Sequence, residues 1–124
     1  MNKNSNIGFV GLGNMGKPIF DNLNKNFSNI FCFDKDTSKL KKNNFSSSLI
    51  EIFEKCKIII FCIDSNEQII DIIKENKIKK NTVIVDLTSS LPDLTKKISS
   101  YLKKFESHYI DAGMSGGALS LIHI

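Results

Sequence analysis

Three glycines, Gly11, Gly13 and Gly16, follow a short apolar run and precede a helical pattern, with the spacing G-x-G-x-x-G. In such a turn the first glycine allows a tight bend, the second lets the backbone approach a pyrophosphate, and the third lets a helix pack closely on a strand. The N-terminus of the following helix offers backbone N–H groups to phosphate oxygens. The spacing predicts a dinucleotide-binding turn, but three glycines alone also occur in turns without a ligand.

An acidic residue beyond the glycine turn strengthens this interpretation. Residues 29–33 form a plausible second strand, and Asp34 follows it at about the distance at which a carboxylate binds the ribose hydroxyls of a dinucleotide. A carboxylate would repel the 2′-phosphate of NADP, and no arginine follows to receive one, so Asp34 favours NAD. Lys35 is a partial argument for NADP.

These residues are carried by a chain in which strand and helix patterns alternate. Strands are predicted at residues 7–10, 29–33, 57–63, 82–85 and 108–110, with a weak one around residue 45. Helices are predicted at residues 15–25, 49–53, 66–77 and 92–102, with a short helical start at 36–40. The apolar run 57–63 is typical of a parallel strand buried on both faces. The fold class is therefore α/β, a Rossmann-type doubly wound parallel sheet with helices on both faces, and the loops after its strands should gather at one edge.

Composition excludes several classes of function. The 124 residues are 41% hydrophobic and 24% charged, which suits one globular domain. The first five residues are polar and no apolar run approaches 18 residues, so neither a signal peptide nor a transmembrane helix is expected, and the cytoplasm is the expected location.

Charge and cysteine content argue against nucleic-acid binding and against a metal site. The net charge of +4 comes from scattered lysines without any arginine, which favours a solvated surface over nucleic-acid binding. Cys32, Cys56 and Cys62 form no C-x-x-C pair and are interpreted as buried, reduced thiols, so no metal site is expected. His108 begins a predicted strand away from the glycine turn, which makes a catalytic role improbable.

Three motifs in order resemble the 3-hydroxyisobutyrate dehydrogenase family, also called the β-hydroxyacid dehydrogenases. Residues 11–16, with Pro18 and the pair Asn22 and Leu23, are similar to its G-L-G-x-M-G-x-P-M-x-x-N-L opening. Residues 86–92 resemble its D-x-S-T-x-x-P loop, and residues 111–117 its D-A-P-V-S-G-G substrate loop. The chain departs from the family at Gly113 and at Asp64, where proline is usual or common.

The resemblance implies roles for individual residues. The cofactor-binding positions it implies are Gly11, Leu12, Gly13, Asn14, Met15, Gly16, Asp34, Ile63, Asp64, Gln68 and Ser89. The positions that it implies for the substrate carboxylate are Ser115, Gly116 and Gly117. Ser89 can equally cap the helix predicted after it.

The resemblance also implies parts that this sequence lacks. The family's general acid is a lysine in a later G-x-x-G-x-G-x-x-x-K segment, which leads into an all-helical second domain. We therefore expect residues 1–118 to be a cofactor-binding domain that is incomplete at its C-terminal end, with no catalytic residue present. Residues 119–124 are expected to be a non-native tail, because Leu-Ser-Leu-Ile-His-Ile is what a common transposase-type sequencing adapter encodes.

The sequence thus predicts the N-terminal cofactor-binding part of an NAD-dependent oxidoreductase that interconverts a small 3-hydroxy acid and its semialdehyde. The fragment alone is expected to be inactive, and the full-length protein is expected to be a homo-oligomer with no nucleic-acid or membrane partner. Two alternatives remain open: a non-catalytic dinucleotide-binding or redox-sensing module, and an enzyme like 6-phosphogluconate dehydrogenase or an imine reductase.

Overall fold

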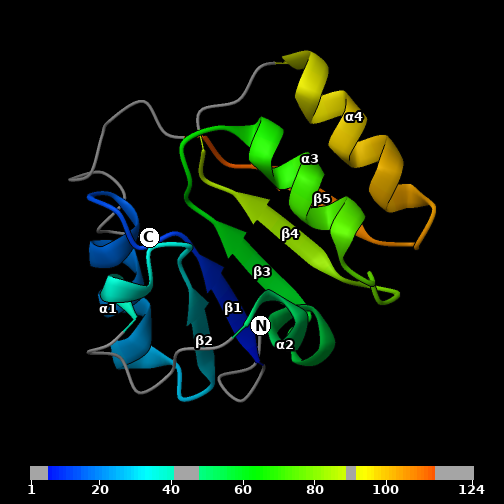
Figure 1. The fold of residues 1–124 in the computed structure, drawn as a ribbon. Helices are drawn as coiled ribbons and strands as arrows, with labels where there is room; N and C mark the ends of the chain where they lie inside the picture. The colour runs from blue at the N-terminus through cyan, green and yellow to red at the C-terminus, as the bar shows by residue number, and fades with distance from the viewer. Residues whose placement is uncertain (1–5, 41–47, 89–91, 114–124) are drawn as a thin grey trace.

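The computed structural model describes residues 6–40, 48–88 and 92–113, in which strands and helices alternate along the chain (Figure 1). The strands are β1 (Ile7–Val10), β2 (Ile30–Phe33), β3 (Ile58–Phe61), β4 (Val83–Asp86) and β5 (His108–Asp111). The helices are α1 (Gly16–Asn26), α2 (Leu49–Lys55), α3 (Asn66–Glu75) and α4 (Pro92–Lys103), with a short 3-10 helix, η1 (Thr37–Lys39), after β2. The weak strand expected around residue 45 lies outside the described residues.

The strands form one parallel sheet in the order β2-β1-β3-β4-β5. Their register aligns the last residues of all five, because Val10 pairs with Phe33 and Phe61, and Asp86 pairs with Phe61 and Asp111. The loops that follow the strands consequently begin at one edge, as the sequence predicts. The order reverses between β1 and β3, and the crevice at such a reversal is where open α/β sheets bind ligands.

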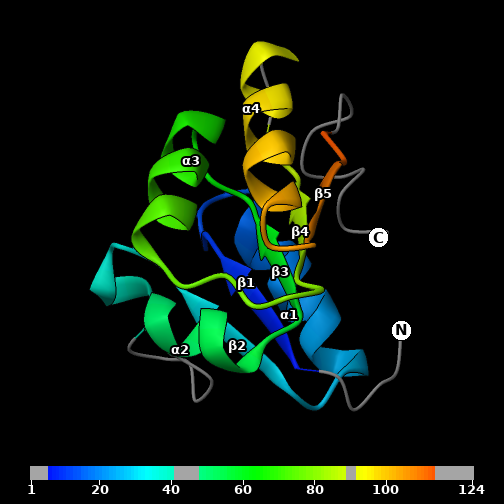
Figure 2. The ribbon, with the colours of Figure 1, turned by 90° about the vertical axis from the view of Figure 1, so that its right-hand side faces the viewer.

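The two faces of the sheet are covered unequally. Helix α1 packs on one face through Ile19 and Phe20, whereas α2, α3 and α4 pack on the other through residues such as Ile52, Ile69 and Ile98. Figure 2 shows α1 on the opposite side of the sheet from α2 and α3. This arrangement follows from right-handed crossovers, because the chain steps in one direction from β1 to β2 and in the other from β2 onward.

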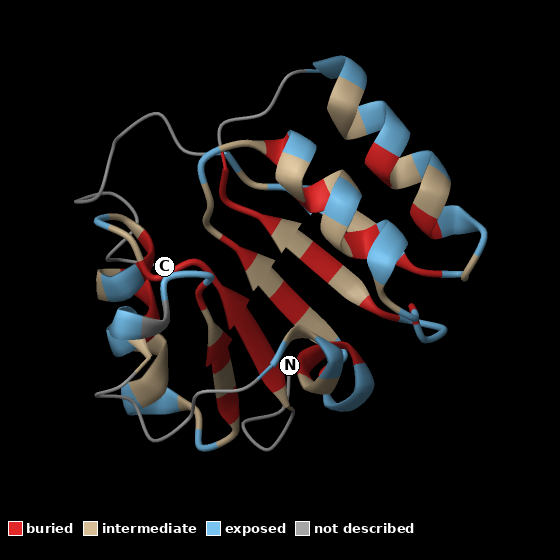
Figure 3. Cartoon of the chain, viewed as in Figure 1, coloured by how far each residue is buried: buried red, intermediate tan, exposed pale blue. Residues whose placement is uncertain are grey.

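The unequal cover corrects one expectation about the core. All four residues of β1 are buried, whereas in β3 buried Ile59 and Phe61 alternate with half-buried Ile58 and Ile60 (Figure 3). The prediction that the apolar run 57–63 is buried on both faces is therefore wrong for five of its seven residues, since only Ile59 and Phe61 are buried. The reason is that α1 lies over β1 and β2 and leaves the same face of β3 only partly covered.

The N-termini of α2 and α3 differ in side-chain capping. Ser48 caps α2, because its hydroxyl accepts a hydrogen bond from the N–H of Glu51 at 3.1 Å. Ser65 precedes α3 but its side chain makes no capping hydrogen bond. None of the helices in the described ranges has the length and apolar character that a membrane span requires.

Candidate functional site

Two of the three glycines in the turn after β1 cannot be replaced without a steric conflict. Gly11 has a φ of +108°, and a Cβ on it would lie 2.1 Å from the carbonyl oxygen of Cys62 at the end of β3. A Cβ on Gly16 would lie 2.0 Å from the carbonyl oxygen of Gly11 itself. These two glycines are therefore required by the protein's own backbone, in the turn and packing roles that their spacing predicts.

Gly13 differs from its neighbours in the turn. A Cβ built on Gly13 would meet no protein atom within 4 Å, and its φ is outside the left-handed region. Nothing in the described structure explains a glycine here by internal packing. The open space in front of Gly13 is what the backbone needs if a ligand is to approach it closely.

Asp34 connects the end of β2 to the glycine turn. One of its carboxylate oxygens, Oδ2, accepts a hydrogen bond from the N–H of Leu12 at 2.7 Å, and the other, Oδ1, accepts one from the N–H of Asp36 at 2.8 Å. The side chain is largely buried, at 9% exposure. Each carboxylate oxygen can accept a second hydrogen bond, so the carboxylate both holds the turn in place and keeps acceptor capacity for a ligand hydroxyl.

A hollow of about 140 Å³ lies at this edge of the sheet, between the glycine turn, the end of β2 and the start of α3. It brings together six of the predicted cofactor-binding residues: Gly11, Gly13, Asp34, Ile63, Asp64 and Gln68. The volume is below the roughly 300–1,000 Å³ of a whole small-molecule pocket, so the hollow can take only part of a dinucleotide.

A second set of hydrogen bonds links the loops after β3 and β4. The N–H of Ile63 donates to the hydroxyl of Thr88 at 3.2 Å, and the N–H of Thr88 donates to Oδ1 of Asp86 at 2.7 Å. Asp86 has no exposed surface, and the hydroxyl of Tyr109 on β5 donates to its Oδ2. The buried carboxylate therefore ties β4, β5 and the Ile63 loop together at the edge that bears the hollow.

Four predicted cofactor residues do not line the hollow. Leu12 contributes its N–H to Asp34 while its side chain packs in the core below, and Met15 packs against the same core. Asn14 is exposed, and Gly16 is buried under the carbonyl of Gly11. Ser89, Ser115, Gly116 and Gly117 lie outside the described residues, so their predicted roles stay predictions.

The hollow also includes residues that the sequence reasoning missed. Lys39, Phe33 and Ile72 line it, together with Lys35, which the sequence already named as a partial argument for NADP. The signal for Lys39 was the short helical start at 36–40, which forms as η1 and returns the chain toward the end of β2. Lys35 and Lys39 add positive charge to a hollow that also contains the carboxylates of Asp34 and Asp64.

The cysteines are free thiols with raised pKa values where a shift is resolved. Burial raises the pKa of the Cys56 thiol to about 11. Burial, with a smaller contribution from the nearby Asp86 carboxylate, raises the pKa of Cys62, which lines the hollow. No cluster of three or more potential metal ligands occurs in the part of the chain that the structure describes.

The chain matches one family model over most of its length. The family is described as the NAD binding domain of 6-phosphogluconate dehydrogenase, and the match covers residues 6–121.

Curated relatives show the same relationship at the level of sequence. The mitochondrial 3-hydroxyisobutyrate dehydrogenase of Mus musculus is 30% identical over 121 residues, which cover 90% of this chain and 36% of the mouse protein. The 2-(hydroxymethyl)glutarate dehydrogenase of Eubacterium barkeri is 31% identical over 132 residues, covering 94% of this chain and 42% of that protein. The chain therefore spans about two fifths of the length of the relatives that it matches.

Solved structures confirm the fold. The 3-hydroxyisobutyrate dehydrogenase of Mycobacterium tuberculosis, solved with L-serine, superposes with a TM-score of 0.84 at 20% identity, covering 94% of this chain and 42% of that one. A reductive aminase from Aspergillus terreus, in complex with NADPH and ethyl levulinate, superposes with a TM-score of 0.82 at 14% identity, covering 93% and 42%. At these identities the likeness concerns the fold alone.

Proposed function

Because the chain belongs to the family of the NAD binding domain of 6-phosphogluconate dehydrogenase, we propose that it is the cofactor-binding part of an NAD-dependent oxidoreductase that interconverts a small 3-hydroxy acid and its semialdehyde. Membership of this family identifies the chain as the NAD-binding domain of an oxidoreductase family. The reaction and its substrate are the proposed part.

One observation carries the proposal. The carboxylate of Asp34 and the open backbone of Gly13 line the same hollow at the reversal of strand order. In this arrangement Asp34 would accept hydrogen bonds from a ribose, and the backbone at Gly13 and the start of α1 would face the pyrophosphate. The first turn of α1 contains no acidic residue that would repel phosphate. The nicotinamide of a bound cofactor would supply hydride transfer, and this chain's residues would hold the cofactor in place for it.

The substrate class comes from the names of two relatives. 3-Hydroxyisobutyrate and 2-(hydroxymethyl)glutarate both carry a hydroxymethyl group on the carbon next to a carboxylate. A dehydrogenase acting on that group makes a semialdehyde. Ser115, Gly116 and Gly117 remain the proposed residues for the substrate carboxylate, since a small acid needs convergent hydroxyl and N–H donors.

The choice between NAD and NADP depends on three side chains in the hollow. Asp34 opposes a 2′-phosphate, whereas Lys35 and Lys39 would attract one. Asp34 is fixed by two backbone N–H groups, while both lysines are exposed, so we propose that the carboxylate decides and that NAD is preferred.

Titration of the chain with NADH and with NADPH tests the proposal, with NADH fluorescence as the readout. We expect NADH to bind about tenfold more tightly, which corresponds to roughly 1.4 kcal/mol. Glu67 is exposed on α3 and does not line the hollow. The variant Glu67→Gln therefore serves as a charge control, in which the affinities for both cofactors should stay unchanged. Absence of binding by either cofactor would contradict the assignment of the site, and tighter binding of NADPH would reverse the preference.

The family description names 6-phosphogluconate dehydrogenase, so an enzyme like that one stays an open alternative. The curated relatives named above favour the 3-hydroxy acid reaction instead. The reductive aminase shares the fold at 14% identity, which does not carry its chemistry to this chain. A cofactor-sensing module without catalysis would bind NADH equally well, so it is distinguished only by assaying a longer chain with a semialdehyde. A homo-oligomeric full-length protein and a location in the cytoplasm stay predictions.

A further inference from the structure

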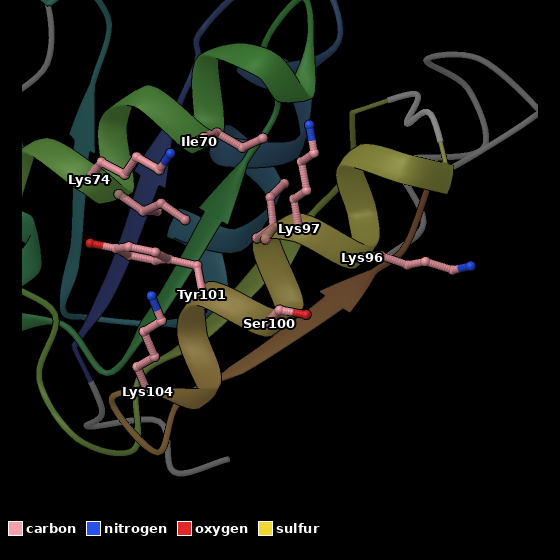
Figure 4. Close-up of a pocket in the computed structure, with 9 residues that line it drawn as sticks. Ile70, Lys74, Lys96, Lys97, Ser100, Tyr101 and Lys104 are labelled. Atoms are coloured by element: carbon pink, nitrogen blue, oxygen red, sulfur yellow. The ribbon is translucent and has the colours of Figure 1, made fainter.

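A groove of about 390 Å³ runs between α3 and α4, on the face of the sheet that these helices cover (Figure 4). Its lining consists of Ile70, Ile73, Lys74, Lys96, Lys97, Ile98, Ser100, Tyr101 and Lys104. The cofactor proposal uses none of these residues. The groove is separate from the hollow at the glycine turn, with which it shares no lining residue.

The groove is strongly basic. Four of its nine lining residues are lysines and none is acidic. All four lysines are exposed, and none takes part in the ion pairs of the described residues, which use Lys17, Lys55 and Lys80. The four lysines of this groove are therefore not held in ion pairs by the described part of the chain.

The floor and walls between the lysines are apolar. Ile73 and Ile98 are completely buried beneath the groove, while Ile70 and Tyr101 are half-buried at its surface. The ammonium of Lys104 lies 5.5 Å from the centre of the Tyr101 ring. Figure 4 shows Lys97 and Lys104 leaving α4 on the same side as Tyr101, whereas Lys96 points away from α3.

The spacing of the charges indicates an extended occupant. Lys97, Tyr101 and Lys104 recur at i, i+4 and i+7, so the two lysines flank the tyrosine along about 10 Å of helix. A single carboxylate or phosphate would contact only one of them, and no buried polar group marks a point site for it. A ligand that complements the groove has carboxylates about two helical turns apart with an apolar side chain between them.

We propose that the groove between α3 and α4 is a docking surface for an acidic amphipathic helix of a partner protein. Such a helix would place two or three acidic residues against Lys74, Lys97 and Lys104 and an apolar residue against Ile70 and Tyr101. Helices commonly bind in this manner, with apolar anchors in a groove and charged residues at its rim. A nucleic acid fits less well, because the chain has no arginine and the centre of the groove is apolar.

The test uses the whole chain and a fluorescein-labelled helical peptide with two glutamates seven positions apart flanking a leucine pair. Fluorescence anisotropy gives the dissociation constant in low and high salt. We expect saturable binding that weakens with salt, and about tenfold weaker binding to the variant Lys74→Gln/Lys97→Gln/Lys104→Gln, since exposed ion pairs each contribute a small factor. A peptide with glutamines in place of the glutamates should not bind.

The matched control is Lys25→Gln/Lys57→Gln/Lys103→Gln, which removes the same charge from exposed lysines outside the groove. An equal loss in both variants would show non-specific attraction and overturn the proposal, as would no binding at all. If a single-stranded oligonucleotide bound more tightly than the peptide and displaced it, the proposal of a partner helix would be wrong and the groove would be a nucleic-acid site. Circular dichroism establishes that each variant is folded, and NADH titration should be unchanged in the groove variant.

Discussion

The hollow at the glycine turn and the groove between α3 and α4 differ in size, charge and construction. The hollow has about 140 Å³ and includes glycine backbone and a fixed carboxylate in its lining, whereas the groove has about 390 Å³ and is lined by exposed lysines over an apolar floor. In the hollow, Asp34 is held by two backbone N–H groups and Gly11 has a backbone that side chains rarely adopt. The groove contains no comparable constraint.

The comparison shows why volume alone is a poor guide to the cofactor site that we propose. A ligand that must be placed within a fraction of an ångström needs rigid donors and acceptors, and the smaller hollow has them. The larger groove offers long, rotatable side chains, which suit a partner recognised by charge and shape with modest affinity. Each of the following predictions would weaken this contrast if its outcome were reversed.

The largest effect is expected from the glycine turn. Gly11→Ala places a Cβ against the carbonyl of Cys62 in a left-handed backbone, so we expect destabilisation of about 3 kcal/mol or more. Gly13→Ala meets no protein atom and should change the free energy of unfolding by less than about 0.5 kcal/mol. Urea unfolding measures both.

The same pair separates folding from binding. Gly13→Ala should weaken NADH binding even though the chain stays stable, because the added methyl group occupies the space that the ligand needs. If Gly13→Ala instead bound NADH like the original chain, the open space at this position would not be a ligand site.

Asp34→Asn should cost about 2 kcal/mol, because an amide cannot accept hydrogen bonds on both of its arms from the N–H groups of Leu12 and Asp36. The matched control is Asp64→Asn, since Asp64 lines the same hollow but is exposed. Its change should stay within about 0.5 kcal/mol. Equal effects of the two substitutions would show that the carboxylate does not hold the turn.

Substitution of the two half-buried tyrosines compares the edge of the sheet that bears the hollow with the groove. Tyr109→Phe removes a donor to the fully buried carboxylate of Asp86 and should cost about 1–2 kcal/mol in urea unfolding. Tyr101→Phe in the groove should cost close to nothing, because its hydroxyl makes no hydrogen bond within the described ranges. Amide exchange should become faster at Thr88 and Ile63 in Tyr109→Phe and stay unchanged in Tyr101→Phe.

The smallest effect concerns the reactivity of Cys62. Its raised pKa means that the thiolate becomes abundant only at a higher pH than in an unfolded chain, so labelling by a thiol reagent should be slow near neutrality and accelerate as the pH rises. Because Cys62 lines the hollow, NADH should slow the labelling, whereas the acidic peptide should not. Mass spectrometry separates this site from Cys32 and Cys56, which are buried. Protection by the peptide would contradict the separation of the two regions.

The sequence by itself determined the local features of this protein. Alternating patterns gave the five strands and four principal helices, and the spacing of Gly11, Gly13 and Gly16 gave the turn, because periodicity and backbone sterics act over a few residues. The strand ends moved by one or two residues: β3 ends at Phe61 where the prediction continued to Ile63. The family resemblance of the motifs is confirmed as well.

Only the tertiary structure decided which distant residues meet. The strand order brings together the two hydrogen bonds from Leu12 to Asp34 and from Tyr109 to Asp86. The position at which α1 packs decides that one face of β3 is only half covered. The basic groove arises in the same way, because Lys74 on α3 and Lys97 on α4 come together only when the two helices pack side by side. Scattered lysines looked like a plain solvated surface in the sequence, since residue spacing along one chain carries no information about the distance between two separate helices.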